Sequence, residues 1–294
     1  MSNFLQLLFI GLFEGSLYAM VAASIVLVYK STHVVSLAHG QLMAYGALAF
    51  WFALTVLKLH FIIALLLAII CLAAFGWLIE RLAMRPLIGQ PLFAAFLTTF
   101  ALFLLGDGIF QLILKGKSAS FAAYLPGGMT PVLGVSLPTT QLISFGVCLA
   151  LFLCLAIFFQ KTKIGLGMRA TAEDHQLAQS TGISVRAIFS WIWIISAMVA
   201  TIAGIALANV RDIYFPLPSL GVKGLIVALV GGLESLPGAL LAGLLLGVLE
   251  NVSAGYLDPL VGGGVKEVAA YVLLLFILLV KPYGLFGLVR IERI

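Results

Sequence analysis

The sequence predicts an all-α, polytopic integral membrane protein with about eight to nine membrane segments, including one broken pair of half-helices. Composition is the first observation, because 63% of the 294 residues are hydrophobic and only 9% are charged. Soluble domains carry about 25% charged residues, so this chain lacks the side chains to cover a water-facing surface. The second observation is a series of apolar runs close to the length of about 20 residues that spans a bilayer. Soluble enzymes, secreted disulfide scaffolds and disordered chains are therefore excluded.

The apolar runs follow one another along the whole chain with short polar connections. The first run contains Glu14 and has no basic segment before it, so we expect it to remain as a membrane helix and not to be cleaved as a signal peptide. No soluble domain separates the runs, which predicts a single transmembrane domain over residues 1–294. The predicted segments are Phe4–Val28, Val34–Val56, Phe61–Ile79, Leu92–Leu114, Gln141–Phe159, Ala187–Val210, Leu225–Leu233, Leu236–Val252 and Val268–Val280.

The broken pair is predicted within Gly221–Tyr256, which would make about 54 Å of helix and is too long for one span. Helix-breaking residues interrupt it in the middle, at Gly231, Gly232, Pro237 and Gly238. Interrupted membrane segments are typical of the pathway of a transporter. Beyond the break, small residues repeat every four positions, at Ala239, Gly243 and Gly247. This spacing allows two helix backbones to approach closely.

Charged residues between the runs divide between two sides of the membrane when the runs are threaded through it in order. Ten basic residues fall on one side: Lys30, Arg81, Arg85, Lys161, Lys163, Arg169, Arg186, Lys281, Arg290 and Arg293. Six fall on the other: Lys58, Lys115, Lys117, Arg211, Lys223 and Lys266. Cytoplasmic loops carry the excess of basic residues, so the N-terminus is predicted outside and the C-terminus in the cytoplasm. The polar segment of about residues 161–186 is then cytoplasmic, and that of about 115–140 is extracytoplasmic.

The sequence contains no catalytic, nucleotide-binding or metal-binding motif. The patterns GxSxG, HExxH and GxxxxGK[ST] are all absent, so this chain alone cannot hold nucleotide phosphates. The cysteines and histidines lack the spacing of a metal site. We therefore predict no catalytic residue, no metal ligand and no cofactor in this chain.

Acidic residues in or beside the apolar runs are candidates for function, because an unpaired charge in hydrocarbon is costly unless it faces a cavity or a partner. Glu14 lies inside the first run, and Glu234 lies at the break. Glu14 either contacts a translocation path or is solvated near the outer interface. Glu234 either lines or gates a path or caps the following helix. The sequence shows no evident partner for either carboxylate.

Ser36, His39 and Gly40 form a second candidate site. A histidine beside a glycine exposes its ring where the backbone is irregular, and irregular backbone at membrane depth is tolerated only where it lines a cavity or is buried in protein. The segment therefore either lines a path or contains a histidine whose ring is satisfied by packing.

The longest polar stretch on the basic side, residues 161–186, is a third candidate. Thr171 followed by Asp174 resembles a capping box, and Gly182 is a typical helix stop. These signals predict a short helix over Ala172–Ser180. Its narrow apolar side contains Leu177 and Ala178. Because so short a helix is unstable alone in water, we expect it to dock on a partner; the alternative is a solvated loop.

Six segments in order along the chain resemble the membrane permeases of branched-chain amino acid ABC importers, the LivH type. They are GLFEGSLYAMVAASIVLVY, SLAHGQLMAYGA, ERLAMRPL, GLGMRATAEDHQLAQSTGI, VGGLESLPGALLAGLLLGVLE and KPYGLFG. The chain departs from the family pattern at Ser36-Leu37, where Asn-Phe is usual, and at Lys30 and Glu234, where glycine is usual.

The resemblance implies one half of the translocation pore of an ATP-driven importer in the bacterial inner membrane. It implies four kinds of partner: a second homologous permease, two cytoplasmic ATPases that hold ATP-Mg, an extracytoplasmic binding protein, and membrane lipid. The solute would be a branched-chain amino acid or a related urea, amide or aromatic acid. The candidate path residues are Glu14, Ser36, His39, Gly40, Gly232, Glu234 and Ser235. Implied residues of the ATPase coupling loop are Arg169, Ala170, Glu173, Asp174, Leu177, Ala178 and Gly182.

Two other functional classes are weighed against this importer. A stand-alone secondary transporter or channel would need its own ion or substrate site, and the apparently unpartnered carboxylates argue against one. An integral membrane enzyme would need clustered histidines and carboxylates at one interface, which the sequence does not show.

Overall fold

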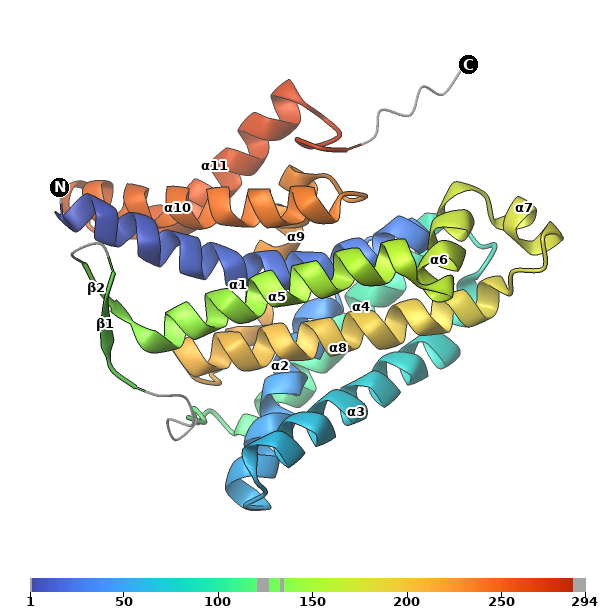
Figure 1. Cartoon of the computed structure of the whole chain (residues 1–294), viewed down its shortest axis with the longest axis horizontal. Coiled ribbons are helices and arrows are strands. Elements are labelled where there is room, and N and C mark those ends of the chain that lie inside the picture. The colour runs from blue at the N-terminus through green and yellow to red at the C-terminus, as the bar shows by residue number, and fades with distance from the viewer. Residues whose placement is uncertain (1, 121–126, 133–134, 288–294) are drawn as a thin grey trace.

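The computed structural model describes residues 2–120, 127–132 and 135–287, and these residues form an assembly of long helices (Figure 1). Nine apolar helices coincide with the predicted membrane segments: α1 (Ser2–Thr32), α2 (His39–Trp51), α3 (Phe61–Ile79), α4 (Leu92–Leu114), α5 (Thr139–Lys161), α8 (Val185–Arg211), α9 (Leu220–Gly231), α10 (Leu236–Val261) and α11 (Val265–Val280). The other elements include α6 (Lys163–Glu173), α7 (His175–Ser180), and the strands β1 (Met129–Val132) and β2 (Val135–Pro138). The all-α class is confirmed.

Six of these helices are long and apolar enough to cross a membrane on their own. They are α1, α3, α4, α5, α8 and α10. Helix α2 is continued by a wider helical turn at Phe52–Val56, and α9 follows a short turn at Leu217–Ser219. The polytopic membrane character is confirmed, while the number of about eight to nine membrane segments stays a prediction.

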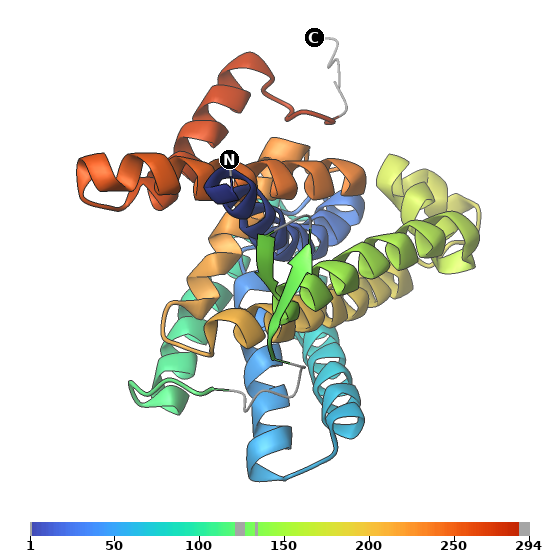
Figure 2. The same ribbon diagram turned by 60° about the vertical axis from the view of Figure 1, so that its left-hand side comes forward.

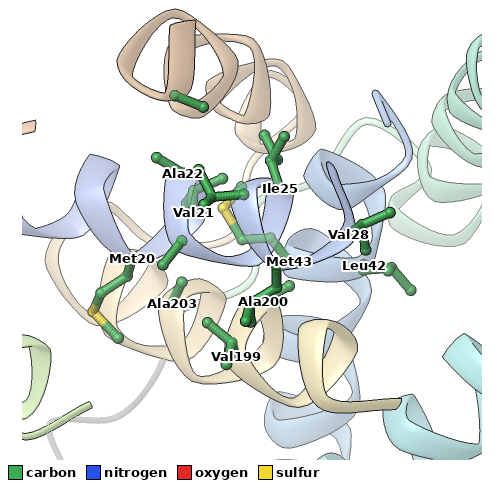
Figure 3. Packing of buried hydrophobic residues seen from close by; sticks show 14 of the residues in the cluster. Met20, Val21, Ala22, Ile25, Val28, Leu42, Met43, Val199, Ala200 and Ala203 are labelled. Atoms are coloured by element: carbon green, nitrogen blue, oxygen red, sulfur yellow. The ribbon is translucent and has the colours of Figure 1, made fainter. Parts of the chain in front are cut away.

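Helix α1 lies in the middle of the bundle, surrounded by α10, α8, α9 and α5 (Figures 1 and 2). Its apolar stretch is 83% buried, whereas that of α4 is only 11% buried. Small and medium side chains of α1, α2 and α8 form the centre of the core (Figure 3). Helix α1 is thus packed within protein, and α4 leaves most of its apolar surface for lipid or a partner.

Helices α1 and α10, the pair with the most extensive contact, pack on each other through glycines on both helices. A Cβ atom added at Gly247 would collide with the carbonyl oxygen of Gly11, and one at Gly15 would collide with that of Gly243. Each helix therefore carries a glycine pair spaced by four residues, the arrangement that brings membrane helix backbones together. The predicted small-residue face of α10 is confirmed, and its partner is α1.

The predicted break between two half-helices is also confirmed. Helix α9 ends at Gly231 and α10 begins at Leu236, where the Ser235 hydroxyl accepts a hydrogen bond from the backbone N–H of Gly238. Gly232 has a φ of +99°, which favours glycine. The N–H groups of Leu285 and Phe286 donate to the carbonyls of Val230 and Gly231. The KPYGLFG segment thus satisfies carbonyls at the end of α9 that the helix itself leaves unpaired.

The two long polar segments lie at opposite ends of the bundle (Figure 1). Helices α6 and α7 lie at one end, and the antiparallel hairpin β1–β2 lies near the N-terminus at the other. This arrangement matches the division of basic residues between two sides. Which end faces the cytoplasm stays a prediction.

Candidate functional site

The predicted path residues lie in three separate environments rather than in one site. Glu14 belongs to a network of charged side chains formed by α1, α8, α10 and α11. Ser36, His39 and Gly40 lie at the turn into α2, against α8 and the start of α9. Gly232, Glu234 and Ser235 form the turn between α9 and α10. Their role in a path stays a prediction.

Glu14 contacts two cationic side chains at once. Arg211 Nη2 donates to Glu14 Oε1 at 2.6 Å, and Lys266 Nζ donates to Glu14 Oε2. Asn251 Nδ2 also donates to Oε2, at 3.0 Å. The Glu14 side chain is 12% exposed. The view of this carboxylate as unpartnered was wrong, because its partners are 197 to 252 residues away in sequence.

A second ion pair lies beside this network. Lys223 Nζ donates to Glu250 Oε1 at 2.9 Å, and the Glu250 side chain is fully buried. The same ammonium lies 5.4 Å from the ring centre of Tyr18. Lys223 and Glu250 are not among the path residues predicted from the sequence. Glu250 in an apolar run and Lys223 near one were the available signals, but only the fold brings them together.

We predict that Glu14→Gln lowers the stability of the folded chain by about 3 kcal/mol, because it leaves Arg211 and Lys266 without their shared counter-ion. The expected readout is a lower thermal unfolding midpoint in detergent. Glu173→Gln is the matched control, because Glu173 is exposed and belongs to no described ion pair. Equal midpoints for both variants would contradict the structural role of Glu14.

His39 is completely buried and both of its ring nitrogens have partners. Nδ1 lies 2.9 Å from the Ser36 hydroxyl and Nε2 lies 3.2 Å from that of Ser196. Its ring also packs on Trp193, with 5.5 Å between ring centres. Gly40 packs so closely on Gly221 that neither has room for a side chain. In this conformation the irregular backbone before α2 is buried in protein, the second of the two alternatives that the sequence left open.

The polar segment after α5 contains two helices, and its predicted helix boundary was wrong. Helix α6 runs through Ala172, and the short helix α7 begins only at His175. Asp174 caps it alone, accepting hydrogen bonds from the N–H groups of Gln176 and Leu177 at 2.7 and 3.0 Å. Thr171 is buried within α6, where its hydroxyl donates to the carbonyl of Gly167. The side-chain packing of Thr171 decided between two residues that are both suited to an N-cap.

The end of α7 agrees with the sequence prediction. Gly182 has a φ of +86°. Its N–H donates to the carbonyl of Gln179, and that of Ile183 donates to the carbonyl of Ala178. These two bonds form a Schellman motif, which explains the glycine. Helix α7 is therefore fixed at both ends by hydrogen bonds.

The two apolar residues of α7 face opposite environments. Leu177 is 65% exposed, whereas Ala178 is 3% exposed and belongs to the hydrophobic core of this chain. The prediction that Leu177 and Ala178 share one apolar side for docking was therefore wrong. Ala178 packs inward, and of these two residues Leu177 alone is available to a partner. Of the other predicted coupling residues, Glu173 and Asp174 are exposed and Arg169 and Ala170 are half-buried.

We predict that Asp174→Ala frees the start of α7, while Asp174→Asn preserves it, because asparagine is an equally good N-cap. The measurement is amide hydrogen exchange at Gln176 and Leu177. The two amide hydrogen bonds hold the pKa of Asp174 below its usual value of 3.8. The cap is then complete above that value and is lost as pH falls through the lowered pKa. The cap therefore stays complete between about pH 5 and 8, and the difference in exchange protection between the unmodified protein and the alanine variant should be constant over that range. Protection of Gln176 and Leu177 in the alanine variant equal to that in the unmodified protein would contradict the assignment.

A buried carboxylate at the same end of the bundle was overlooked as a structural site. Arg85 donates from Nε and Nη2 to the two oxygens of Glu80, at 2.9 and 2.8 Å, and Ser190 of α8 donates to the same carboxylate. The interaction joins the end of α3 to α8, and the five-residue spacing of Glu80 and Arg85 was the available signal. In the described parts of the chain, no three histidine, cysteine or acidic side chains are grouped closely enough to hold a metal ion.

Comparison with known proteins identifies the family of this chain. Residues 7–281 match the family model described as "Branched-chain amino acid transport system / permease component". The chain belongs to this permease family. It is 30% identical to the high-affinity branched-chain amino acid transport system permease protein BraD of Pseudomonas aeruginosa, over 99% of this chain and 98% of that protein. It is 28% identical to the corresponding protein LivH of Escherichia coli K12, with the same coverage.

The fold of this permease is also similar to a solved structure, PsaBC from Streptococcus pneumoniae in complex with Fab. The TM-score is 0.50 at 17% identity, over 97% of this chain and 94% of that one. The likeness concerns the fold. Family membership and the apolar helices together identify this permease as a multi-pass membrane component of a transport system and not itself an enzyme.

Proposed function

We propose that this permease forms half of the translocation path of a binding-protein-dependent ABC importer for branched-chain amino acids. The observation that carries the proposal is the similarity to BraD and LivH over 99% of the chain. It includes every apolar helix and the α6–α7 segment, so the similarity covers both the membrane bundle and the candidate coupling element. Urea, amides and aromatic acids are the alternative solutes.

The proposed assembly contains a second homologous permease, two cytoplasmic ATPases with bound ATP-Mg and an extracytoplasmic binding protein. Helix α7 is the proposed contact with one ATPase, because it is fixed at both ends and carries the exposed Leu177. The α7 end of the bundle is then cytoplasmic and the N-terminus lies outside.

A stand-alone secondary transporter or channel is the alternative function. Unpartnered membrane carboxylates do not exclude it, because Glu14 and Glu250 are both paired. Membership of a family of transport-system permease components now supports the importer instead.

The proposal is tested by uptake in cells that express the complete transporter with or without this chain. Radiolabelled L-leucine, urea, an aliphatic amide and an aromatic acid are supplied separately. We expect leucine uptake to require the chain. Dependence of another solute on the chain would reassign the solute, and uptake of all four without the chain would refute the proposed function.

A further inference from the structure

A pocket of about 240 Å³ lies at the α7 end of the bundle, away from the candidate path residues. Its wall is formed by the end of α1, the connection between α3 and α4, the start of α4, and helices α7 and α8. Most of the lining side chains are apolar, among them Val34, Met84, Phe189 and Trp193. The pocket thus joins segments that are far apart in the sequence.

The pocket has a buried floor and an exposed rim. Trp193 is only 1% exposed, and Val34 and Ala95 are also buried. On the rim, Ile88 and Leu92 are 38% and 58% exposed. Leu92 is the first residue of α4, the helix whose apolar stretch is only 11% buried. The rim is therefore continuous with an apolar surface of the kind that faces lipid.

Two side chains near the pocket indicate its level in the membrane. The guanidinium of Arg81 lies 5.1 Å from the ring centre of Trp77, and both residues are exposed. Tryptophan is enriched at the level of the lipid headgroups, and a basic side chain near a helix end extends its charge to the same level. Arg81 comes three residues before Met84, which lines the pocket. We therefore place the pocket near the headgroups of one leaflet.

The pocket also contains a polar atom that has no partner in the described chain. Nδ1 of His175 is buried, and no described residue forms a hydrogen bond with it. The His175 ring packs against His33 and Phe189, with 6.5 and 5.6 Å between ring centres. A buried polar atom without a hydrogen bond is costly. A ligand with an apolar chain and a polar head would fill the pocket and satisfy this nitrogen.

A phospholipid fits these features better than a small polar solute. Apolar cavities exclude water and accept apolar guests. One water molecule takes up about 30 Å³ of liquid, so the pocket has room for several carbon atoms of an acyl chain. An amino acid or urea would instead bury its polar groups against an apolar wall, which costs free energy. The surrounding membrane supplies acyl chains directly at the rim.

We propose that this pocket binds one acyl chain of a membrane phospholipid, whose phosphate accepts a hydrogen bond from His175. An imidazole Nδ1 donates such a bond when it carries the ring proton. The lipid then contacts α4 and α7 at once and links the exposed membrane helix to the short polar helix. The proposal does not rest on the import function or on the identity of the solute.

The test is quenching of Trp193 fluorescence by phosphatidylglycerol that carries bromine on its acyl chains. Replacing Trp51, Trp77 and Trp191 with phenylalanine leaves Trp193 as the single tryptophan of the full chain. The lipid is added to the delipidated protein in detergent. Bromine quenches tryptophan only near contact, and Trp193 is buried, so quenching requires a chain inside the pocket. We expect saturable quenching; its absence would overturn the proposal.

A substitution that fills the pocket should prevent this quenching. Ala95→Phe adds a ring at the buried wall, and Ala95→Leu is the milder variant if the first does not fold. Ala101→Phe is the matched control, because Ala101 is exposed on the same helix and does not line the pocket. Quenching that persists in the folded Ala95 variants would show that the chain lies elsewhere.

The contact with the phosphate is tested by removing either partner. Phosphatidylglycerol should half-quench Trp193 at a concentration at least about tenfold lower than diacylglycerol with the same brominated chains, as expected for a hydrogen bond to a charged group. His175→Phe keeps the aromatic ring, and it should abolish this preference while quenching itself remains. An unchanged preference in His175→Phe, or none in the unmodified pocket, would overturn the role of His175.

Discussion

Replacing Leu177 with glutamate is expected to lower solute uptake by at least about thirtyfold, because a central apolar anchor of an interface contributes 2 kcal/mol or more. Leu177 is exposed on a helix fixed at both ends, so a charge there affects a docked partner and not the core of this chain. The measurement combines solute uptake with stimulated ATP hydrolysis of the assembled complex. Both should fall while the permease remains in the membrane at its normal level.

The matched control is Gln179→Glu, which adds the same charge to an exposed position of the same helix. It lies two positions after Leu177, which places it on nearly the opposite side of α7. Its uptake should remain near that of the unmodified protein. If Leu177→Glu transports as well as Gln179→Glu, α7 does not contact the ATPase. Ala178→Glu is unsuitable for this purpose, because Ala178 is buried in the chain itself.

Gly247→Val is expected to prevent stable folding of the bundle. A side chain at this position meets the backbone of Gly11 and Gly15, which cannot move aside like a flexible side chain. Overpacking typically costs about 1–3 kcal/mol, and this contact lies between the central helix and its most extensive partner. We therefore expect a loss above about 3 kcal/mol, measured as the amount of folded protein in the membrane and its thermal midpoint.

Gly108→Val provides the control for this substitution. Gly108 also lies within a helix, α4, but a Cβ there would meet no atom within 4 Å. Both variants lose the same glycine flexibility, so their difference reports packing alone. Equal stability of the two variants would show that α1 and α10 are not packed as described.

Features set by local chemistry were predictable from the sequence. The break between α9 and α10 follows from Gly231, Gly232 and Pro237, and the end of α7 follows from Gly182. These residues act through backbone conformation, which depends on few neighbours. The apolar runs predicted the positions of the long helices for a similar reason. In lipid, each membrane segment must pair its own backbone N–H and C=O groups, which a helix does locally.

Features set by tertiary packing were not predictable. Thr171 and Asp174 are both suitable caps, and only the burial of Thr171 within α6 decides that α7 begins later. The inward orientation of the Ala178 side chain is likewise determined by its packing in the hydrophobic core. The partners of Glu14 come from α8, α10 and α11, and no local pattern in the sequence connects residues so far apart.

We propose that this permease moves solute only when partner ATPases hydrolyse ATP. The most direct measurement is uptake of radiolabelled L-leucine into proteoliposomes that contain the complete transporter, with ATP-Mg on the ATPase side and binding protein on the other. We expect uptake with ATP, and none with a non-hydrolysable analogue or without the binding protein. Uptake by the permease alone, driven by an ion gradient and indifferent to ATP, would contradict it.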